Sequence, residues 1–391
     1  MGKQSARLYY RGQDHVDILC DRLMGDDVHT GGVLENYYKI YKGDELVWKK
    51  EVPKYIFACG SILTTDKLKT FSGFHFYDYR HRQLESKSAY IISFLSGTFF
   101  LTTYDGEAIF YSEDGYTWKT LLENTDEKYG TIKRYGNALY VLTSKRLLRI
   151  SKSSGSISLN TAFNYTDVLK GKECLGLLIS TYYALNSFLV GDGYMIVPVW
   201  TGNVTRPFGS TEFVRAHTHT LISFNVNTGV AEIVAANLPY NITSYTGGCY
   251  HNGYLYCGFW NGEGGDIFGG TSKSLVRRTK DGYAWETYSS IDNFAGLTQI
   301  FFAGEFLYLI KDGNIRRTKD GVSIEAFSLK GVNRNVFYIG GKFFFGTVDG
   351  KICSVDDLSD TSDSKEERVT LAAPMNIYSV ACSDDSVKII C

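Results

Sequence analysis

Hydrophobic residues along most of this chain form short alternating runs, separated by turns rich in Gly, Asn and Asp. Such alternation predicts β-strands, because successive side chains of a strand point to opposite faces of its sheet. The clearest unit lies at 93–121, where four runs follow one another across tight turns. We therefore expect an all-β protein built from small four-stranded antiparallel sheets.

The same order of strands recurs along the chain. The hexapeptide RRTKDG occurs at 277–282 and again at 316–321, so its two copies lie 39 residues apart. A repeat of this length is typical of one blade of a β-propeller. Together with 93–121, the units at about 132–160, 187–234, 247–288, 299–329 and 335–370 make six complete blades.

Strand-like segments remain at both ends of the repeat region. Lys54 to Phe76 precedes the first blade, and Tyr378 to Cys382 and Val387 to Cys391 follow the last one. An open ring would leave an unpaired strand edge at each end, which folded proteins avoid. We therefore predict that residues 51–391 form a seven-bladed β-propeller, closed by strands from both termini.

Residues 1–50 fall outside the repeat. Tyr37 to Trp48 contains two alternating runs around a Lys-Gly-Asp turn, which predicts a small β-hairpin preceded by a polar extended segment. So short a hairpin needs a partner to be stable. We expect residues 1–50 to be an N-terminal attachment segment, separate from the ring.

Composition excludes several classes of function. Lys and Arg number 41 against 42 Asp and Glu, so no bulk positive charge is available for a nucleic acid, and we expect no nucleic-acid partner. No run of about 18 apolar residues occurs, so we expect no membrane insertion. The basic first residues lead into LYYR without an apolar stretch, so we expect no signal peptide.

Metal and cofactor chemistry also finds little support in the sequence. The eight cysteines are scattered without a C-x-x-C pair, which favours free core thiols over a zinc or redox motif. His217 and His219 would lie on one side of a strand, but no third ligand is evident, and we interpret them as ordinary loop histidines. We expect no metal and no cofactor.

Three turns share a Ser/Thr-x-Asp-Gly pattern, namely SEDGYTW at 112–118, TKDGYAW at 279–285 and TKDGVSI at 318–324. They resemble the Asp-box, or BNR repeat, of sialidase-like β-propellers, in which such turns join the third and fourth strands of a blade. Turn chemistry explains these residue types, since the oxygens accept backbone N–H bonds and Gly supplies a positive φ. We therefore assign a structural role to Ser112, Asp114, Gly115, Trp118, Thr279, Asp281, Gly282, Trp285, Thr318, Asp320 and Gly321.

The resemblance does not bring a catalytic pattern with it. Sialidases carry an Arg-Ile-Pro motif, an arginine triad and a Tyr/Glu nucleophilic pair, and no Arg-Ile-Pro occurs in this sequence. Arginines occur at Arg134, Arg206, Arg215 and Arg334, but nothing in the sequence indicates that three of them converge on one substrate carboxylate. Sialidase activity is therefore not expected, and we assign no catalytic residue.

Two long segments should emerge on the face that propellers usually use for ligands. They are expected as loops joining the second and third strands of neighbouring blades, at 200–215 and 260–270. Both open with a Trp and mix carboxylates, amides and aromatic rings, a composition that suits binding of a sugar. An equally good interpretation is that the two segments only cover the centre of the ring. The expected ligand-binding residues are Trp200, Arg206, Phe208, Glu212, Arg215, Trp260, Asn261, Glu263 and Asp266.

These observations favour a non-catalytic binding propeller that recognises a host-surface glycan or protein. Residues 8–15 and 41–48 resemble the leaders of prophage tail-associated proteins, which implies a virion or tail partner for residues 1–50. The protein would then be made in a bacterial cytoplasm and act in the virion or outside the cell. One alternative is a glycoside hydrolase or polysaccharide lyase that uses Glu212 with Glu263 or Asp266. Another is a purely structural scaffold.

Overall fold

The computed structural model describes, with their side chains, residues 52–65, 68, 89–123, 126–170, 188–199, 220–234, 248–258, 274–292, 294, 297–311, 313–329, 332, 335–359, 377–384, 387 and 389. It also gives the backbone of further strand residues between 5 and 370, as bounded below. Of the residues described, no helix has the length and apolar character that crossing a membrane requires.

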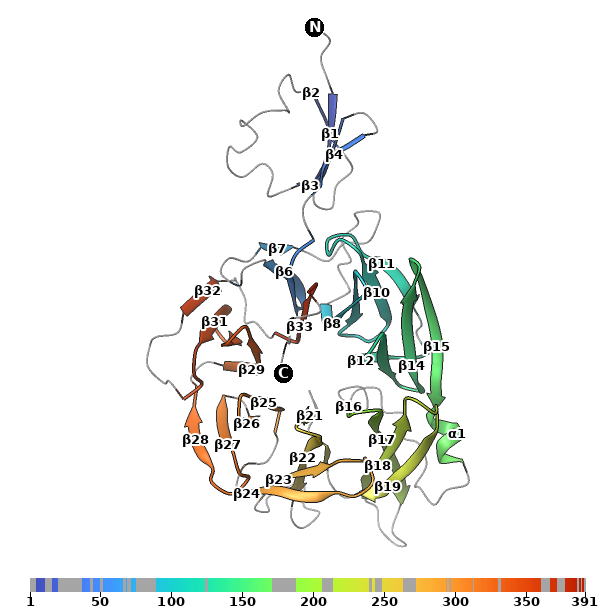
Figure 1. Ribbon diagram of the computed structural model, residues 1–391, viewed down its shortest axis with the longest axis vertical. Coiled ribbons are helices and arrows are strands. Elements are labelled where there is room, and N and C mark those ends of the chain that lie inside the picture. Colours follow the sequence, from blue (N-terminus) through green and yellow to red (C-terminus); the bar gives the residue numbers. More distant parts are fainter. Residues whose placement is uncertain are drawn as a thin grey trace.

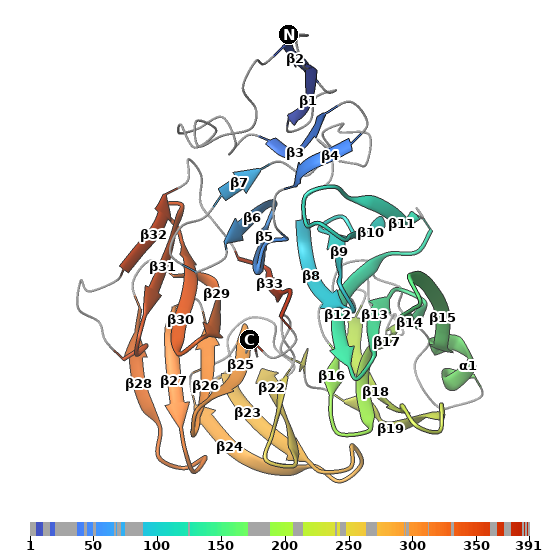
Figure 2. The ribbon, with the colours of Figure 1, turned by 45° about the horizontal axis from the view of Figure 1, so that its top comes forward.

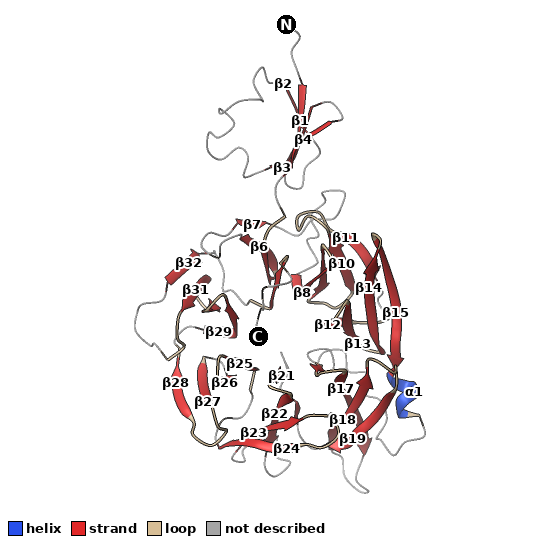
Figure 3. Ribbon diagram, in the orientation of Figure 1, coloured by secondary structure: helices blue, strands red, loops and turns tan. Residues whose placement is uncertain are grey.

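Seven sheets are arranged around a ring, and the chain visits them in sequence order (Figure 1). The expected all-β, seven-bladed β-propeller is therefore confirmed. Strands account for nearly all the regular structure, and the short helix α1 (Tyr165–Leu169) follows the last strand of the second blade (Figure 3).

The first three blades each contain four antiparallel strands in sequence order. The first blade has β8 (Ala89–Leu95), β9 (Thr98–Thr103), β10 (Ala108–Ser112) and β11 (Lys119–Glu123). The second has β12 (Tyr129–Tyr135), β13 (Ala138–Thr143), β14 (Arg146–Ser153) and β15 (Ser156–Asn164). The third has β16 (Leu189–Val190), β17 (Tyr194–Thr205), β18 (Val214–Asn225) and β19 (Ala231–Leu238).

The fourth blade receives its first strand in two pieces, because β20 and β21 both pair with β22. It has β20 (Asn241–Ile242), β21 (Gly248–His251), β22 (Tyr254–Gly262), β23 (Ser272–Thr279) and β24 (Glu286–Asp292). The fifth has β25 (Gln299–Ala303), β26 (Phe306–Lys311), β27 (Asn314–Thr318) and β28 (Glu325–Ser328). The sixth has β29 (Val332–Ile339), β30 (Lys342–Thr347), β31 (Lys351–Val355) and β32 (Glu366–Thr370).

The seventh blade joins the two ends of the repeat region, as the sequence predicts. Its strand order is β33 (Ser379–Cys382), β5 (Tyr55–Cys59), β6 (Ser61–Thr65) and β7 (Ser72–Phe74). The second predicted C-terminal strand, at 387–391, is wrong for the part described. Val387 and Ile389 lie outside any strand and pack against the apolar cluster between the sixth and seventh blades. Of the C-terminal residues that the structure describes, those of β33 join the sheet.

Both faces of every blade are apolar, which explains why the ring closes. The buried hydrophobic residues fall into seven clusters, and each cluster lies between two neighbouring blades. On β9, Phe99 and Leu101 point to the seventh blade, whereas Phe100 points to the second. Burial of apolar surface stabilises a fold by about 25 cal/mol per Å². Both faces of a blade are buried only if each sheet has a neighbour on both sides.

The N-terminal residues form a separate sheet that lies outside the ring (Figures 1 and 2). Its order is β2 (Val16–Leu19), β1 (Ser5–Tyr10), β3 (Tyr37–Lys42) and β4 (Glu45–Lys49). The predicted hairpin is present as β3 and β4, and the preceding segment contributes two further strands, β1 and β2, to the same sheet. Leu8 pairs with Ile40, so β1 adds to the hairpin and β2 adds to β1. A hairpin gains stability from added strands.

Candidate functional site

The antiparallel order gives the ring two unlike faces. Turns between the second and third strands of each blade emerge on one end, here called the loop face. Turns between the third and fourth strands emerge on the opposite end, here called the corner face. The three Ser/Thr-x-Asp-Gly turns join β10 to β11, β23 to β24 and β27 to β28, so all three belong to the corner face.

Hydrogen bonds within each corner engage the aspartate. Asp114 Oδ1 accepts bonds from the backbone N–H groups of Tyr116 and Thr117 at 2.9 and 2.7 Å, and from the Ser112 hydroxyl at 3.0 Å. The Ser112 oxygen in turn accepts the Gly115 N–H at 2.9 Å. These four bonds satisfy turn donors locally, as Asp and Ser do in tight turns.

The other two corners repeat the same bonds. Asp281 Oδ1 accepts the N–H groups of Tyr283 and Ala284, and Asp320 Oδ1 accepts those of the two residues at 322 and 323, all at 2.7–3.0 Å. Backbone hydrogen bonds therefore lower the pKa of Asp281 and Asp320 below the ordinary value. Such carboxylates stay ionised and bonded to their own turn, which fits a structural role.

Each corner also packs against the preceding blade. A Cβ at Gly115 would lie 2.9 Å from the Ile56 side chain, and one at Gly321 would lie 2.3 Å from the Tyr288 carbonyl oxygen. The Trp118 side chain is fully buried in the cluster between the seventh and first blades. Trp285 donates from its indole nitrogen to the Gly282 carbonyl at 3.2 Å. The corners thus help to fix one blade against the next.

The predicted ligand-binding residues lie where the structure gives little or no side-chain detail. Trp200 and Arg215 belong to β17 and β18, and Trp260 and Asn261 belong to β22. Arg206, Phe208, Glu212, Glu263 and Asp266 lie outside the described residues. Their role in binding remains a prediction.

The bounds of the two predicted loops need correction. Strands β17 and β18 remain paired out to Thr205 and Val214, so the connection in the third blade begins only after Thr205. In the fourth blade, β22 continues to Gly262, where it pairs with Ser272. β-branched residues near the predicted loop start, such as Val204 and Thr205, favour strand continuation. Trp200 and Trp260 are therefore strand residues.

Three tyrosines gather on the loop face where the seventh blade meets the first. Tyr90 is the second residue of β8, Tyr104 follows β9, and Tyr378 precedes β33. Their ring centroids lie 5.1–5.7 Å apart in all three pairs. The Tyr104 side chain is 47% exposed, whereas Tyr90 is only 8% exposed. The tyrosine cluster thus combines a buried support with one ring that faces solvent.

The turn that carries Tyr104 is held by its own hydrogen bonds. The Gly106 N–H donates to the Thr103 carbonyl at 2.9 Å, and Gly106 has a φ of +68°. The Asp105 carboxylate accepts the Glu107 N–H at 3.1 Å and also the Thr103 hydroxyl. A turn of this kind followed by a left-handed residue is a common hairpin connection. The turn thus carries Tyr104 and Asp105 together on the loop face.

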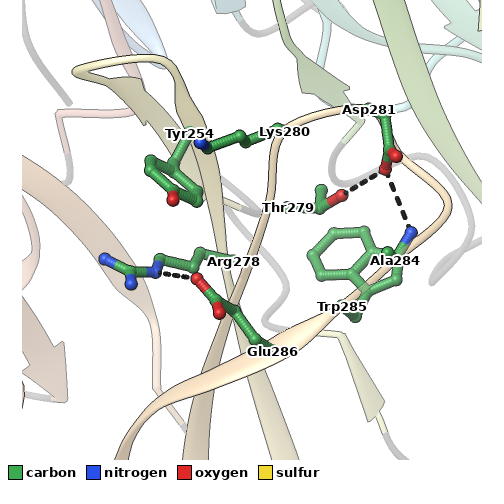
Figure 4. A pocket seen from close by; sticks show the side chains of 8 residues that line it. All are labelled: Tyr254, Arg278, Thr279, Lys280, Asp281, Ala284, Trp285 and Glu286. Carbon is green, nitrogen blue, oxygen red and sulfur yellow. Dashed lines mark hydrogen bonds and ion pairs between the residues drawn. The ribbon is translucent and has the colours of Figure 1, made fainter.

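A second candidate site is a cleft of about 280 Å³ on the corner face of the fourth blade (Figure 4). Arg278 donates from Nε to Glu286 at 2.6 Å, and its guanidinium lies 4.4 Å from the centre of the Tyr254 ring. Lys280 Nζ lies 4.9 Å from the same ring. The lining residues are Tyr254, Arg278, Thr279, Lys280, Asp281, Ala284, Trp285 and Glu286.

Sequence reasoning missed both groups, although signals for them exist. Tyr104 stands at the end of the second strand of its blade, a position that faces the loop end in any propeller. Arg278 and Lys280 belong to the repeated RRTKDG hexapeptide, of which only the turn residues were given a role. Three expected structural residues, Thr279, Asp281 and Trp285, line the cleft. The Oδ1 atom of Asp281 is engaged by hydrogen bonds within the corner.

No group of three or more His, Cys, Asp and Glu residues suited to a metal occurs within the described part of the chain. The five cysteines described there are free, and burial raises the pKa of the Cys59 thiol to about 12. A thiol with so high a pKa is a poor nucleophile at neutral pH. His217 and His219, interpreted above as loop histidines, belong to strand β18, and their side chains lie outside the described residues.

No known protein family and no curated protein matches this sequence. Among solved structures, the chain is similar to apo AztD from Citrobacter koseri, with 12% identity, a TM-score of 0.45, and coverage of 86% of this chain and 98% of that one. It is also similar to BamB from Moraxella catarrhalis, with 12% identity, a TM-score of 0.43, and coverage of 86% and 95%. At such identities, function has to be argued from the residues of this chain.

Proposed function

We propose that this protein is a non-catalytic binding propeller that recognises a host-surface glycan through its loop face. The tyrosine cluster carries the proposal. Tyr104 presents a half-exposed ring that contacts the rings of Tyr90 and Tyr378. Asp105 belongs to the same turn, and Glu107 directly follows it. Sugars bind where an aromatic ring packs against their apolar face and nearby polar groups bond their hydroxyls.

The polar groups beside the cluster support binding rather than turnover. Asp105 accepts two hydrogen bonds within its turn, and Glu107 forms an ion pair with Lys128 at 2.9 Å. A general acid or nucleophile needs a carboxyl group within reach of the substrate bond. The aspartates of the corners are engaged in the same way. We further propose that these corners are Asp-box turns.

We also propose that the N-terminal residues attach the ring to a virion or phage tail. Their four-stranded sheet is separate from the seven blades, so a partner that binds it need not disturb the ring. Mass spectrometry on purified particles from a producing culture tests this location. The full chain should co-purify with the particles in constant proportion to the major structural protein, and its absence from them would contradict the attachment.

The binding proposal is tested on the full chain with a panel of purified bacterial surface polysaccharides. Retention on the polysaccharide and release of reducing or unsaturated ends are measured together. We expect retention without product, and a loss of about 1–3 kcal/mol of binding free energy in Tyr104→Ala, as for aromatic anchors elsewhere. Tyr250→Ala is the matched control, since that ring is 43% exposed on β21, away from the cluster.

Other outcomes would count against the proposal in distinct ways. Sustained product formation that a single change at Glu212, Glu263 or Asp266 abolishes would establish a hydrolase or lyase. A scaffold role would follow if Tyr104→Ala, Trp200→Ala and Trp260→Ala all left retention unchanged.

A further inference from the structure

The fourth and fifth blades contain two copies of one charged and aromatic arrangement. Arg278 lies 4.4 Å from the ring of Tyr254, and Arg317 lies 4.4 Å from that of Phe306. Each guanidinium also bonds the first residue of the next strand, Glu286 at 2.6 Å or Glu325 at 2.7 Å. Because the hexapeptide repeats, the two sites are related position by position.

The lysines of the repeat correspond as well. Lys280 Nζ lies 4.9 Å from the Tyr254 ring, and Lys319 Nζ lies 4.5 Å from the Phe306 ring. A cation over an aromatic face is attracted to the ring, and this applies in both blades. The shared arrangement is therefore an arginine and a lysine beside one aromatic ring, with a glutamate paired to the arginine.

The copy in the fifth blade has two additional carboxylates. Asp357, from the sixth blade, accepts bonds from Arg317 Nη1 at 3.0 and 3.3 Å. Glu305 pairs with Lys319 at 2.9 Å. In the fifth blade, the arginine therefore pairs with a second carboxylate, and the lysine pairs with one.

The fourth blade lacks both of these carboxylates. Gly253 occupies the position of Glu305, directly before the first residue of the second strand. Asp320 occupies the position of Asp357, but its oxygens bond the backbone and the Ser323 hydroxyl of its own corner. Within the described part of the chain, the arginine has one carboxylate partner, Glu286, and Lys280 has none.

The cleft opens at this same place and has an aromatic wall that the fifth blade does not have. Trp285 lines it, whereas the corresponding residue in the fifth blade is Ile324. Figure 4 shows Tyr254 and Arg278 on one side of the cleft and Trp285 on the other. A volume of about 280 Å³ lies near the lower end of the roughly 300–1,000 Å³ of small-molecule sites, which suits one ring-sized group.

We propose that this cleft is a second binding site, which takes a carboxylate-bearing pyranose residue of an anionic polysaccharide. The sugar carboxylate replaces the acidic side chains of the fifth blade and bonds Arg278 and Lys280. The pyranose ring packs against Trp285. The two carboxylates of the lining do not oppose it strongly, since Glu286 is paired with Arg278 and Asp281 accepts three bonds in its corner. This site is on the corner face and is independent of the tyrosine cluster.

Isothermal titration of the full chain with a glucuronate oligosaccharide tests the proposal. The fully methyl-esterified oligosaccharide is the ligand control, because it keeps the rings and removes the charge. We expect Lys280→Gln to weaken binding about tenfold, as for loss of a hydrogen bond to a charged group. Trp285→Ile, which introduces the residue of the fifth blade, should weaken it by about fivefold or more. Lys319→Gln is the matched control and should bind as the wild type does.

The outcomes separate this site from the loop face. Tyr104→Ala should leave glucuronate binding unchanged, and Lys280→Gln should leave retention on neutral polysaccharides unchanged. Equal binding of the methyl ester, or wild-type affinity in Lys280→Gln, would overturn the proposal. Equal competition by a short polyglutamate peptide would overturn the assignment to a sugar. Thermal unfolding at the wild-type temperature shows that each variant is folded.

Discussion

Substitution of the corner glycine Gly321 by Ala measures whether the corners fix one blade against the next. Gly321 has a φ of +80°, and a Cβ there would lie 2.3 Å from the carbonyl oxygen of Tyr288 in the preceding blade. A backbone oxygen cannot move away without shifting β24. Gly253 is the matched control, since it has the same φ of +80° and no atom within 4 Å of its added Cβ.

The two variants share one cost and differ in another. Left-handed backbone costs an L-residue roughly 1–2 kcal/mol, and this applies to both positions. Overpacking adds about 1–3 kcal/mol at Gly321 alone. We therefore expect Gly253→Ala to lose about 1–2 kcal/mol of unfolding free energy and Gly321→Ala to lose about 2–5 kcal/mol.

Equilibrium unfolding in guanidinium chloride, followed by tryptophan fluorescence, measures both losses. Gly115→Ala should fall between the two, because its Cβ would meet movable side-chain atoms of Ile56 and Pro53 at 2.9 Å. A loss in Gly321→Ala no larger than that in Gly253→Ala would refute the packing of corner against blade. An altered slope with denaturant would show that the variant changed more than stability.

Trp118→Ala should lose about 3–5 kcal/mol of unfolding free energy in the same assay, because the buried indole fills the junction of the seventh and first blades; a loss under 1 kcal/mol would contradict this junction. Glu127→Gln should lose about 1–3 kcal/mol of unfolding free energy, since the 3% exposed carboxylate accepts bonds from both Thr143 and the Arg146 guanidinium. Arg146→Lys should keep less than half of the stabilisation that the wild-type pair of Glu127 and Arg146 provides. Because the pKa values of Asp281 and Asp320 are lowered by folding, the folded state binds fewer protons than the unfolded state below about pH 4. The contribution of these aspartates to the free energy of unfolding is therefore complete above their unfolded pKa and is lost as pH falls through their folded pKa. The urea midpoint should fall from pH 5 to pH 2, and it should fall less steeply in the double variant Asp281→Asn/Asp320→Asn.

The repeat could be predicted from the sequence because the same local pattern of strands and turns recurs in each blade. Alternating residues such as Phe99 and Phe100 specify a sheet with two apolar faces, and the turn residues at 112–115 specify where the third strand ends. Those signals need no distant partner. They sufficed to predict the blades to within a few residues and to predict that strands from both ends would share one sheet.

Other features required contacts that a linear pattern does not contain. The pairing of β1 with β3 and the continuation of β17 past Trp200 depend on which strand lies alongside, and polar strands leave that choice open. The assembly of Tyr104 with Tyr378 joins residues at opposite ends of the propeller, since ring closure alone brings them together.

The sequence by itself determined the kind of unit and its number, because these follow from side-chain alternation and from the turns within one blade. The tertiary structure alone decided what the surface presents. Whether Arg317 meets Asp357 while Arg278 faces an open cleft depends on the blade that stands beside it. Contacts between neighbouring blades are set by three-dimensional packing, and a repeated motif in identical letters therefore acquires different partners in each copy.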